Sequence, residues 1–121
     1  MIEGLGIDIL TNERLETLEN KTEFTENVFT PEELEFTRLL PYRDRAYALY
    51  FSVKEAVLKA LGCGLQFGSF WRDVEIDNYS HVKTHGNVRD FAAKKSIKKI
   101  HTTSACTKKY ALSVVLLESE N

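Results

Sequence analysis

Cysteine is scarce in this chain, and so are long apolar runs. The two cysteines, Cys63 and Cys106, are too few for a disulfide framework or a zinc site, so we expect a reducing compartment, the cytoplasm. The longest apolar runs are too short to cross a membrane. The N-terminus "MIEGLGIDIL" lacks the basic residues of a signal peptide and carries Glu3 and Asp8 instead, which favours a first strand.

Internal repeats, linkers and low-complexity segments are also absent from the sequence. The chain has 121 residues, of which 43% are hydrophobic and 28% charged. This composition is ordinary for a globular protein with a substantial core. We therefore expect a single domain over residues 1–121.

The small net charge of −2 hides a difference between the two halves. Residues 1–60 hold 7 basic and 12 acidic side chains, whereas residues 61–121 hold 9 basic and 6 acidic ones. The lysines of "KKSIKK" and of Lys108-Lys109 would suit an anionic partner. Alternatively, they cover the solvent-exposed face of a helix. A small nucleic-acid-binding protein is one rival interpretation. The net acidic charge and the lack of an aromatic-basic platform argue against it.

Helix signals cluster in the first half of the chain. A short helix carrying Arg14 follows the first strand, with Thr11 or Asn12 as its cap. The segment "FTPEELEFTRLL" predicts a helix that begins at Thr30 with a capping box, and Pro41 ends it. A long helix is predicted from Arg43 to Leu61, with Gly62 at its C-terminal cap.

Strand signals dominate the second half. Residues 73–77 and 81–85 predict two strands, with a turn at Gly86-Asn87 and a helix over 87–97. "KIHTTSA" and "YALSVVLLE" predict two more strands joined at residues 107–109. The last strand is apolar on both faces, which indicates a central position. These patterns predict the α+β class, with a small, mostly antiparallel sheet packed against one long helix and shorter helices.

The segment "FSVKEAVLKALGCG" carries Glu55 and Lys59 one helical turn apart, on a face separate from the apolar residues. An ordinary surface ion pair at this spacing contributes about 0.2–0.5 kcal/mol and would explain both charges. It does not explain Gly62 and Gly64, which let the main chain approach a bound group closely. A carboxylate one turn before a lysine can hold a divalent cation while the lysine contacts a phosphate.

Asp8 stands between two isoleucines in the first predicted strand. A carboxylate there is costly unless it is paired or bound to a metal. A salt bridge, for example with Arg14, and a helix cap are the alternative explanations. The neighbouring "GLG" is not a dinucleotide fingerprint, because the third glycine is missing and no strand–helix–strand unit follows.

Three segments together, "GLGIDILTNERL", "FTPEELEF" and "FSVKEAVLKALGCG", resemble the holo-acyl-carrier-protein synthase family of 4′-phosphopantetheinyl transferases. Their order and spacing match the family along nearly the whole chain. The most specific element is the pattern "KEAxxKAxGxG". "DVEI" and the closing "YALSVVLLE" also fit.

The resemblance implies transfer of the 4′-phosphopantetheine arm of coenzyme A to a serine of an apo acyl carrier protein, with release of adenosine 3′,5′-bisphosphate. It implies a 4′-phosphopantetheinyl transferase-like fold, commonly a homotrimer with sites at subunit boundaries. Fatty-acid synthesis is the default pathway, and a polyketide or other specialised pathway is an alternative. Neither nucleic acid nor a membrane is an expected partner.

The resemblance also assigns roles to individual residues. Asp8 and Glu55 match the family's metal-binding carboxylates, and Mg²⁺ suits carboxylate and water oxygens. Lys59 matches the lysine that contacts phosphate and assists the transfer. Glu55 is also our candidate acceptor for the serine proton, directly or through a metal-bound water. The other matches are Arg14 for the carrier protein and Gly62, Gly64 and His101 for coenzyme A.

Two departures from the family pattern support a rival interpretation. The family often has an arginine where Tyr50 stands, and a histidine where Cys106 stands, with Ala105 in place of a hydroxyl residue. A catalytically impaired relative that binds coenzyme A or a carrier protein without transfer would fit these losses. The intact Asp8, Glu55 and Lys59 oppose it.

Overall fold

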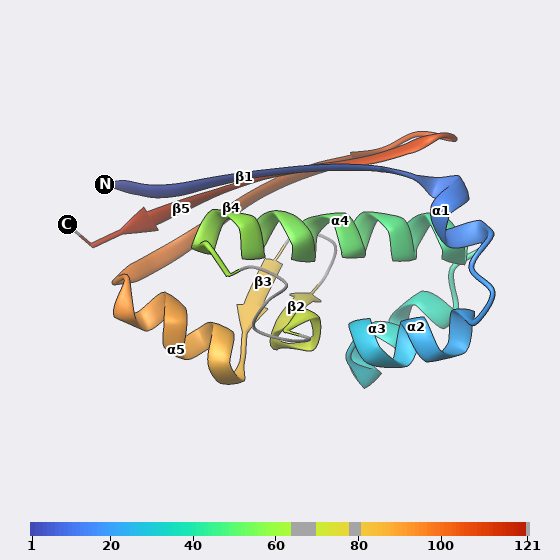
Figure 1. Cartoon of the computed structure of the whole chain (residues 1–121), viewed down its shortest axis with the longest axis horizontal. Helices are drawn as coiled ribbons and strands as arrows, with labels where there is room; N and C mark the ends of the chain where they lie inside the picture. The colour runs from blue at the N-terminus through green and yellow to red at the C-terminus, as the bar shows by residue number, and fades with distance from the viewer. Residues whose placement is uncertain (64–69, 78–80, 121) are drawn as a thin grey trace.

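The structure, a computed structural model, describes residues 1–63, 70–77 and 81–120. A three-stranded sheet covers one side of a long helix, and further helices and a two-stranded sheet lie on its other side (Figure 1). The elements are β1 (Ile2–Thr11), α1 (Asn12–Glu16), α2 (Lys21–Val28), α3 (Pro31–Arg38), α4 (Arg43–Leu61), the 3-10 helix η2 (Trp71–Asp73), β2 (Val74–Asp77), β3 (His81–Thr84), α5 (Gly86–Lys94), β4 (Ile97–Cys106) and β5 (Tyr110–Ser119).

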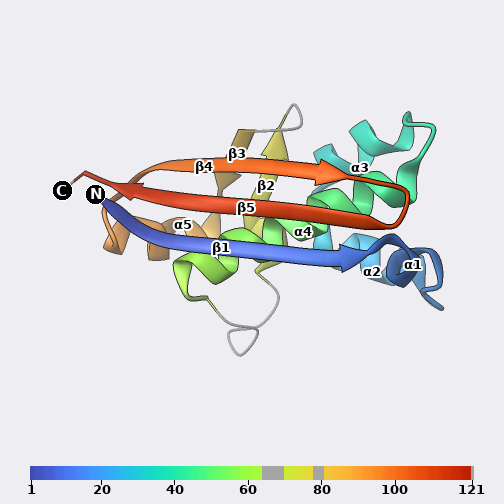
Figure 2. The same ribbon diagram turned by 90° about the horizontal axis from the view of Figure 1, so that it is seen from above.

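The larger sheet has the strand order β1-β5-β4, and both pairings are antiparallel (Figure 2). The predicted central position of the last strand is therefore confirmed. In β5, Ala111, Ser113, Val115 and Leu117 are fully buried on the α4 side of the sheet, while the residues that alternate with them point to the outer face. A second sheet pairs β2 with β3.

The long helix α4 begins at Arg43 and ends at Leu61, as the sequence predicts. Gly62 ends it in the left-handed conformation, with φ +79°, which favours glycine. Because α4 lies between the two layers, its second half is buried on nearly every side. Within that half, Glu55 is only partly covered and Lys59 is exposed.

Helix α3 has the predicted capping box: the Thr30 side chain accepts a hydrogen bond from the Glu33 N–H, and the Glu33 side chain accepts one from Thr30. Helix α2 was not predicted. Asn20 caps it by accepting from the Glu23 N–H at 3.2 Å. This Asn-x-x-Glu spacing was the available signal.

The predicted helix over 87–97 is wrong at both ends. Gly86 and Asn87 begin α5 instead of forming a turn, because the Asp73 carboxylate accepts hydrogen bonds from the Asn87 and Val88 N–H groups. At the other end α5 stops at Lys94, and Ser96 adopts a positive φ of 57°. Strand β4 then begins at Ile97.

Helices precede most of the strands, and both sheets are antiparallel. The predicted α+β class is therefore confirmed. Within the described residues, no helix combines the length and the apolar character needed to cross a membrane.

Candidate functional site

Strand β1 lies in direct contact with α4. A Cβ atom built on Gly4 would lie 2.2 Å from the Ala60 carbonyl oxygen, and one on Gly6 would lie 1.9 Å from the Ala56 carbonyl oxygen. Only glycine permits so close an approach of strand to helix. The "GLG" segment therefore serves packing, and it sets Asp8 beside the last turns of α4.

The Asp8 carboxylate pairs with Lys59: Oδ1 accepts a hydrogen bond from Nζ at 2.8 Å. Asp8 faces α4 with 12% of its side chain exposed, whereas 52% of the Lys59 side chain is exposed. The flanking isoleucines do not enclose Asp8, because Ile7 and Ile9 are 55% and 61% exposed on the outer face. Of the two explanations left open for Asp8, a salt bridge is the one observed, with Lys59 and not Arg14 as the partner.

Glu55 does not pair with Lys59 in the described part of the chain. Its Oε1 accepts a hydrogen bond from the indole N–H of Trp71 at 2.7 Å. The i, i+4 surface pair considered from the sequence is therefore not formed. Trp71 belongs to η2, and no pattern in the sequence placed it beside Glu55.

A cavity of about 550 Å³ brings these groups together. Four of the seven residues predicted for the site line it. Its polar lining is Asp8, Arg14, Asn27, Glu55 and Lys59, and its apolar lining is Ile9, Leu10, Phe24, Val28, Phe51 and Trp71.

The donor set of this cavity fits a hard divalent cation. Asp8 and Glu55 supply carboxylate oxygens from two different elements, and Mg²⁺ is usually held by one or two carboxylates while it keeps several waters. Lys59 has an exposed side chain, so it can leave Asp8 and turn toward another anion. The described residues contain no group of three or more His, Cys, Asp and Glu side chains that would form a closed protein cage.

Of the residues predicted for coenzyme A, Lys59 lines this cavity, whereas His101 and Gly62 do not. His101 is on β4, and its Nε2 lies 2.9 Å from Glu118 Oε1 on the outer face of the sheet. The hydrogen bond from His101, with the charge of Lys98, holds the pKa of Glu118 below its ordinary value. Gly62 caps α4 outside the cavity lining, and Gly64 lies outside the described residues.

The two positions that depart from the family pattern also lie away from the cavity. Tyr50 is 1% exposed and lines a separate, smaller cavity of about 140 Å³ with Glu32 and Glu75. Cys106 is an exposed free thiol at the end of β4. Neither Tyr50 nor Cys106 belongs to the lining of the Asp8–Glu55 cavity.

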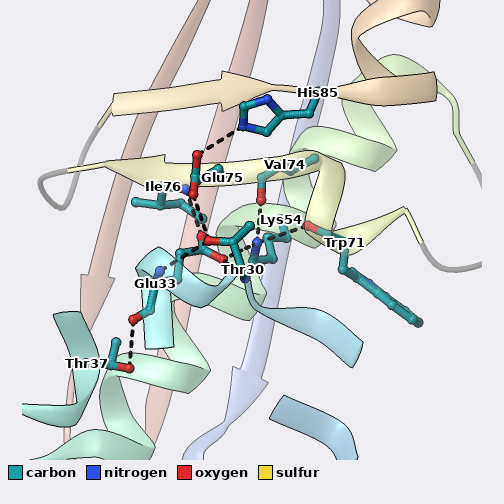
Figure 3. A network of polar contacts seen from close by, with 9 residues as sticks. All are labelled: Thr30, Glu33, Thr37, Lys54, Trp71, Val74, Glu75, Ile76 and His85. Atoms are coloured by element: carbon teal, nitrogen blue, oxygen red, sulfur yellow. Dashed lines mark hydrogen bonds and ion pairs between the residues drawn. The ribbon is translucent and has the colours of Figure 1, made fainter. Parts of the chain in front are cut away.

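A buried ion pair that sequence analysis did not identify lies on the other side of α4 (Figure 3). Lys54 Nζ lies 2.8 Å from Glu33 Oε1, and both side chains are at most 1% exposed. Lys54 also donates hydrogen bonds to the carbonyl oxygens of Trp71 and Val74. Burial lowers the pKa of Lys54, and the Glu33 charge partly opposes that change.

The Glu33 carboxylate extends this network (Figure 3). Its Oε2 accepts from the Ile76 N–H at 2.8 Å, and its Oε1 accepts from the Thr30 N–H at 2.9 Å. The pair therefore joins α3, α4, η2 and β2 in one hydrogen-bonded unit. The cue in the sequence was a lysine directly after Val53, in a half of α4 that is mostly apolar.

A sequence model of the 4′-phosphopantetheinyl transferase superfamily matches residues 4–115 of the chain. A holo-[acyl-carrier-protein] synthase of Geobacter sulfurreducens is 36% identical over 124 residues, covering 98% of each chain. The holo-ACP-synthase of Plasmodium yoelii superposes with a TM-score of 0.84 at 29% identity, covering 100% of this chain and 98% of that one.

A holo-(acyl-carrier-protein) synthase of Bacillus anthracis, solved in complex with CoA (3′,5′-ADP), superposes with a TM-score of 0.80 at 28% identity, covering 99% of each chain. The family model, the curated relative and the solved structures agree along nearly the whole sequence. This chain belongs to the 4′-phosphopantetheinyl transferase superfamily.

Proposed function

We propose that residues 1–121 form one holo-[acyl-carrier-protein] synthase domain. It would transfer the 4′-phosphopantetheine group from coenzyme A to a serine of an apo acyl carrier protein and release adenosine 3′,5′-bisphosphate. The observation that carries the proposal is the meeting of Asp8, Glu55 and Lys59 in one cavity. Curated relatives named for this activity, similar over nearly their whole length, support it.

Asp8 and Glu55 are the residues that would hold Mg²⁺. Both carboxylates line the cavity, and among the described residues neither belongs to a closed set of ligands that would exclude a substrate oxygen. When bound, the ion would neutralise charge on the diphosphate of coenzyme A and help to orient it. Phosphoryl transfer depends mainly on positioning and charge neutralisation, so a site of this composition is chemically sufficient.

Lys59 would exchange partners when the substrate enters. Its ammonium group now lies 2.8 Å from Asp8 Oδ1, at the solvent-exposed edge of the site. In the proposed complex it moves to the diphosphate, where negative charge increases as the nucleotide leaves. A fixed donor aimed at developing charge in a site of this kind typically contributes about 10²–10³ in rate.

Glu55 is the proposed acceptor of the serine proton. The serine oxygen forms a bond to the phosphorus that carries the pantetheine arm, and the bond from that phosphorus to the bridging oxygen breaks. The electron pair leaves with adenosine 3′,5′-bisphosphate, and the hydroxyl proton passes to Glu55. Arg14, on α1 and in the cavity lining, would contact the carrier protein next to the incoming serine.

The outer face of the larger sheet supports a homotrimer. Leu5, Ile7 and Ile9 on β1 are 55–61% exposed, and Tyr110 and Leu112 on β5 continue the apolar surface. His101 projects from β4 onto the same face, since it pairs across the sheet with Leu116. Contact between copies through this face would place His101 near the coenzyme A site of a neighbouring subunit, together with Lys59, Gly62 and Gly64.

The proposed setting is the cytoplasm, in fatty-acid synthesis. Cys63 and Cys106 are both free thiols, in keeping with a reducing compartment. Carrier proteins from more than one pathway should be compared, because the described residues do not select among them.

The test is an incubation with Mg²⁺, coenzyme A and an apo carrier protein, followed by mass spectrometry of the carrier. A gain equal to one phosphopantetheine group, absent with Asp8→Ala, is the expected result. Unchanged carrier mass together with measurable coenzyme A binding would instead identify an impaired relative. Glu55→Gln that binds metal and keeps the wild-type rate would exclude Glu55 as the proton acceptor.

A further inference from the structure

Trp71 forms hydrogen bonds through its main chain and through its side chain with two neighbouring residues of α4. Its main-chain oxygen accepts a hydrogen bond from Lys54 Nζ at 2.9 Å, and its indole N–H donates to Glu55 Oε1 at 2.7 Å. The indole ring also packs near Phe51, with ring centroids 6.0 Å apart. One residue of η2 therefore connects the buried ion pair of Lys54 to the cavity carboxylate of Glu55.

The Lys54 end of this connection is rigid. Lys54 is fully buried and paired with Glu33, which is itself fixed by hydrogen bonds to Thr30 and Ile76 (Figure 3). The main chain of Trp71 is therefore attached to the packed interior. Its side chain extends away from that network in the same view, and the indole N–H donates to Glu55 on α4.

The Glu55 end needs such support. A glutamate has three rotatable side-chain bonds, and Glu55 is only partly covered by its surroundings. A charge-assisted hydrogen bond to Oε1 restricts the carboxylate to one orientation. It leaves Oε2 as the oxygen that a cation or a substrate proton can approach.

We propose that Trp71 is a positioning residue that orients the Glu55 carboxylate for the cation and for the serine hydroxyl. The inference rests on the proposed function, since it assigns Glu55 the same two tasks. Partners that orient a metal ligand in this way typically change metal affinity or activity by about 10–100-fold when they are removed. The effect should fall on kcat and on cation affinity, and not on the Michaelis constant for coenzyme A.

The chain offers a clean experiment because Trp71 is its only tryptophan. Trp71→Phe keeps an aromatic ring and removes the N–H donor. Growth on the tryptophan analogue β-(3-benzothienyl)alanine replaces that N–H with sulfur at this single position and preserves the ring system. Tyr42→Phe, which removes a polar group from an exposed aromatic side chain outside the cavity, is the matched control.

Two readouts separate positioning from structure. Mn²⁺ binding to the protein without coenzyme A, followed by electron paramagnetic resonance, should weaken about tenfold in Trp71→Phe and in the sulfur analogue. In the transfer assay kcat should fall by a similar factor, with the Michaelis constant for coenzyme A changed less than twofold. The melting temperature should stay within about 3 °C of the wild type.

The outcomes are distinguishable from failure of the proposed function. Unchanged Mn²⁺ affinity in both Trp71 variants would overturn the positioning role, whether or not the melting temperature falls. If the wild type transfers nothing yet binds Mn²⁺ more tightly than the variants, the proposed activity fails while Trp71 still positions Glu55.

Discussion

Gly6 and Ala56 are in direct main-chain contact: a Cβ atom on Gly6 would lie 1.9 Å from the Ala56 carbonyl oxygen. At this contact β1 packs directly on α4. Gly4 makes the same kind of contact with Ala60, one helical turn further along α4. Asp8 follows two residues after Gly6 on the same strand face and meets Lys59 at 2.8 Å. The glycines therefore fix the distance between the strand carboxylate and the helix that carries Glu55.

Gly6→Ala should destabilise the fold, because the new methyl group would overlap a main-chain oxygen that cannot move without shifting α4. We expect the free energy of unfolding to fall by about 2–4 kcal/mol. Urea denaturation followed by circular dichroism measures it. Ser104→Ala, a small change on the exposed edge strand β4, should stay within about 0.5 kcal/mol. Equal free energies of unfolding for Gly6→Ala and Ser104→Ala would contradict the close packing of β1 on α4.

The buried pair of Lys54 and Glu33 should be far more sensitive than an exposed pair. Lys54→Met leaves the Glu33 carboxylate buried without its cation, so we expect a loss of about 3–5 kcal/mol in unfolding free energy. Arg38→Met removes the cation from the exposed Glu35–Arg38 pair and should change the unfolding free energy far less, because solvent screens that pair. Similar losses of unfolding free energy in Lys54→Met and Arg38→Met would show that burial does not determine how much an ion pair contributes to stability.

Local signals in the sequence predicted the long helix well. Its apolar spacing and Gly62 define α4 from Arg43 to Leu61, and Thr30 with Glu33 defines the start of α3. Such features depend on a few neighbouring residues, so they can be read before the fold is known. The same is true of β5, whose two apolar faces indicated a central strand.

Features that depend on distant partners could not be predicted. The end of α5 is set by Ser96 with its positive φ and by the pairing of β4 with β5, neither of which is visible in helical periodicity. The Trp71–Glu55 hydrogen bond and the Lys54–Glu33 pair join residues from separate elements. The resemblance to the family brought Asp8, Glu55 and Lys59 together as one site, but their observed partners follow from the tertiary structure.

Lys59→Met should reduce kcat for transfer by about 10²–10³, because it removes the ammonium group next to the site where negative charge develops. Lys59→Arg keeps the charge in a different shape and should retain part of the rate. Lys83→Met is the matched control: Lys83 is 53% exposed, close to the 52% of Lys59, and pairs with Asp77 at 3.5 Å outside the cavity. Steady-state kinetics with an apo carrier protein measures kcat for the wild type and the three variants.

Glu75 should contribute a pH-dependent part of the stability. Burial alone would raise the pKa of Glu75, but hydrogen bonds from Thr30 and His85 outweigh it, and the pKa lies below the ordinary 4.5. Between that lowered value and 4.5 the unfolded chain binds more protons than the folded one, so stability falls as the pH falls through this window. The stabilisation is fully present above the unfolded pKa.

Comparison with Glu75→Gln isolates this contribution. The wild type should be more stable than the variant at pH 7, and the difference should disappear as the pH is lowered through the window below 4.5. Urea denaturation at several pH values between 7 and 3 measures it. Glu26→Gln, at an exposed position on α2, is the control for replacing a surface carboxylate by an amide. A difference that persisted at pH 3 would contradict the assignment.

The proposed homotrimer can be tested on the outer face of the larger sheet. Ile7 is 55% exposed in the single chain, so Ile7→Glu should leave the fold intact, whereas a carboxylate buried between subunits is strongly unfavourable. Light scattering after gel filtration should show three 13.9 kDa chains in the wild type and one in the variant. The variant should also lose transfer activity, because His101 would no longer reach a neighbouring site. Leu39→Glu, at a position 75% exposed but outside the sheet, should remain trimeric and active. A monomeric wild type with full activity would refute the role of this face, since the cavity of one chain would then suffice.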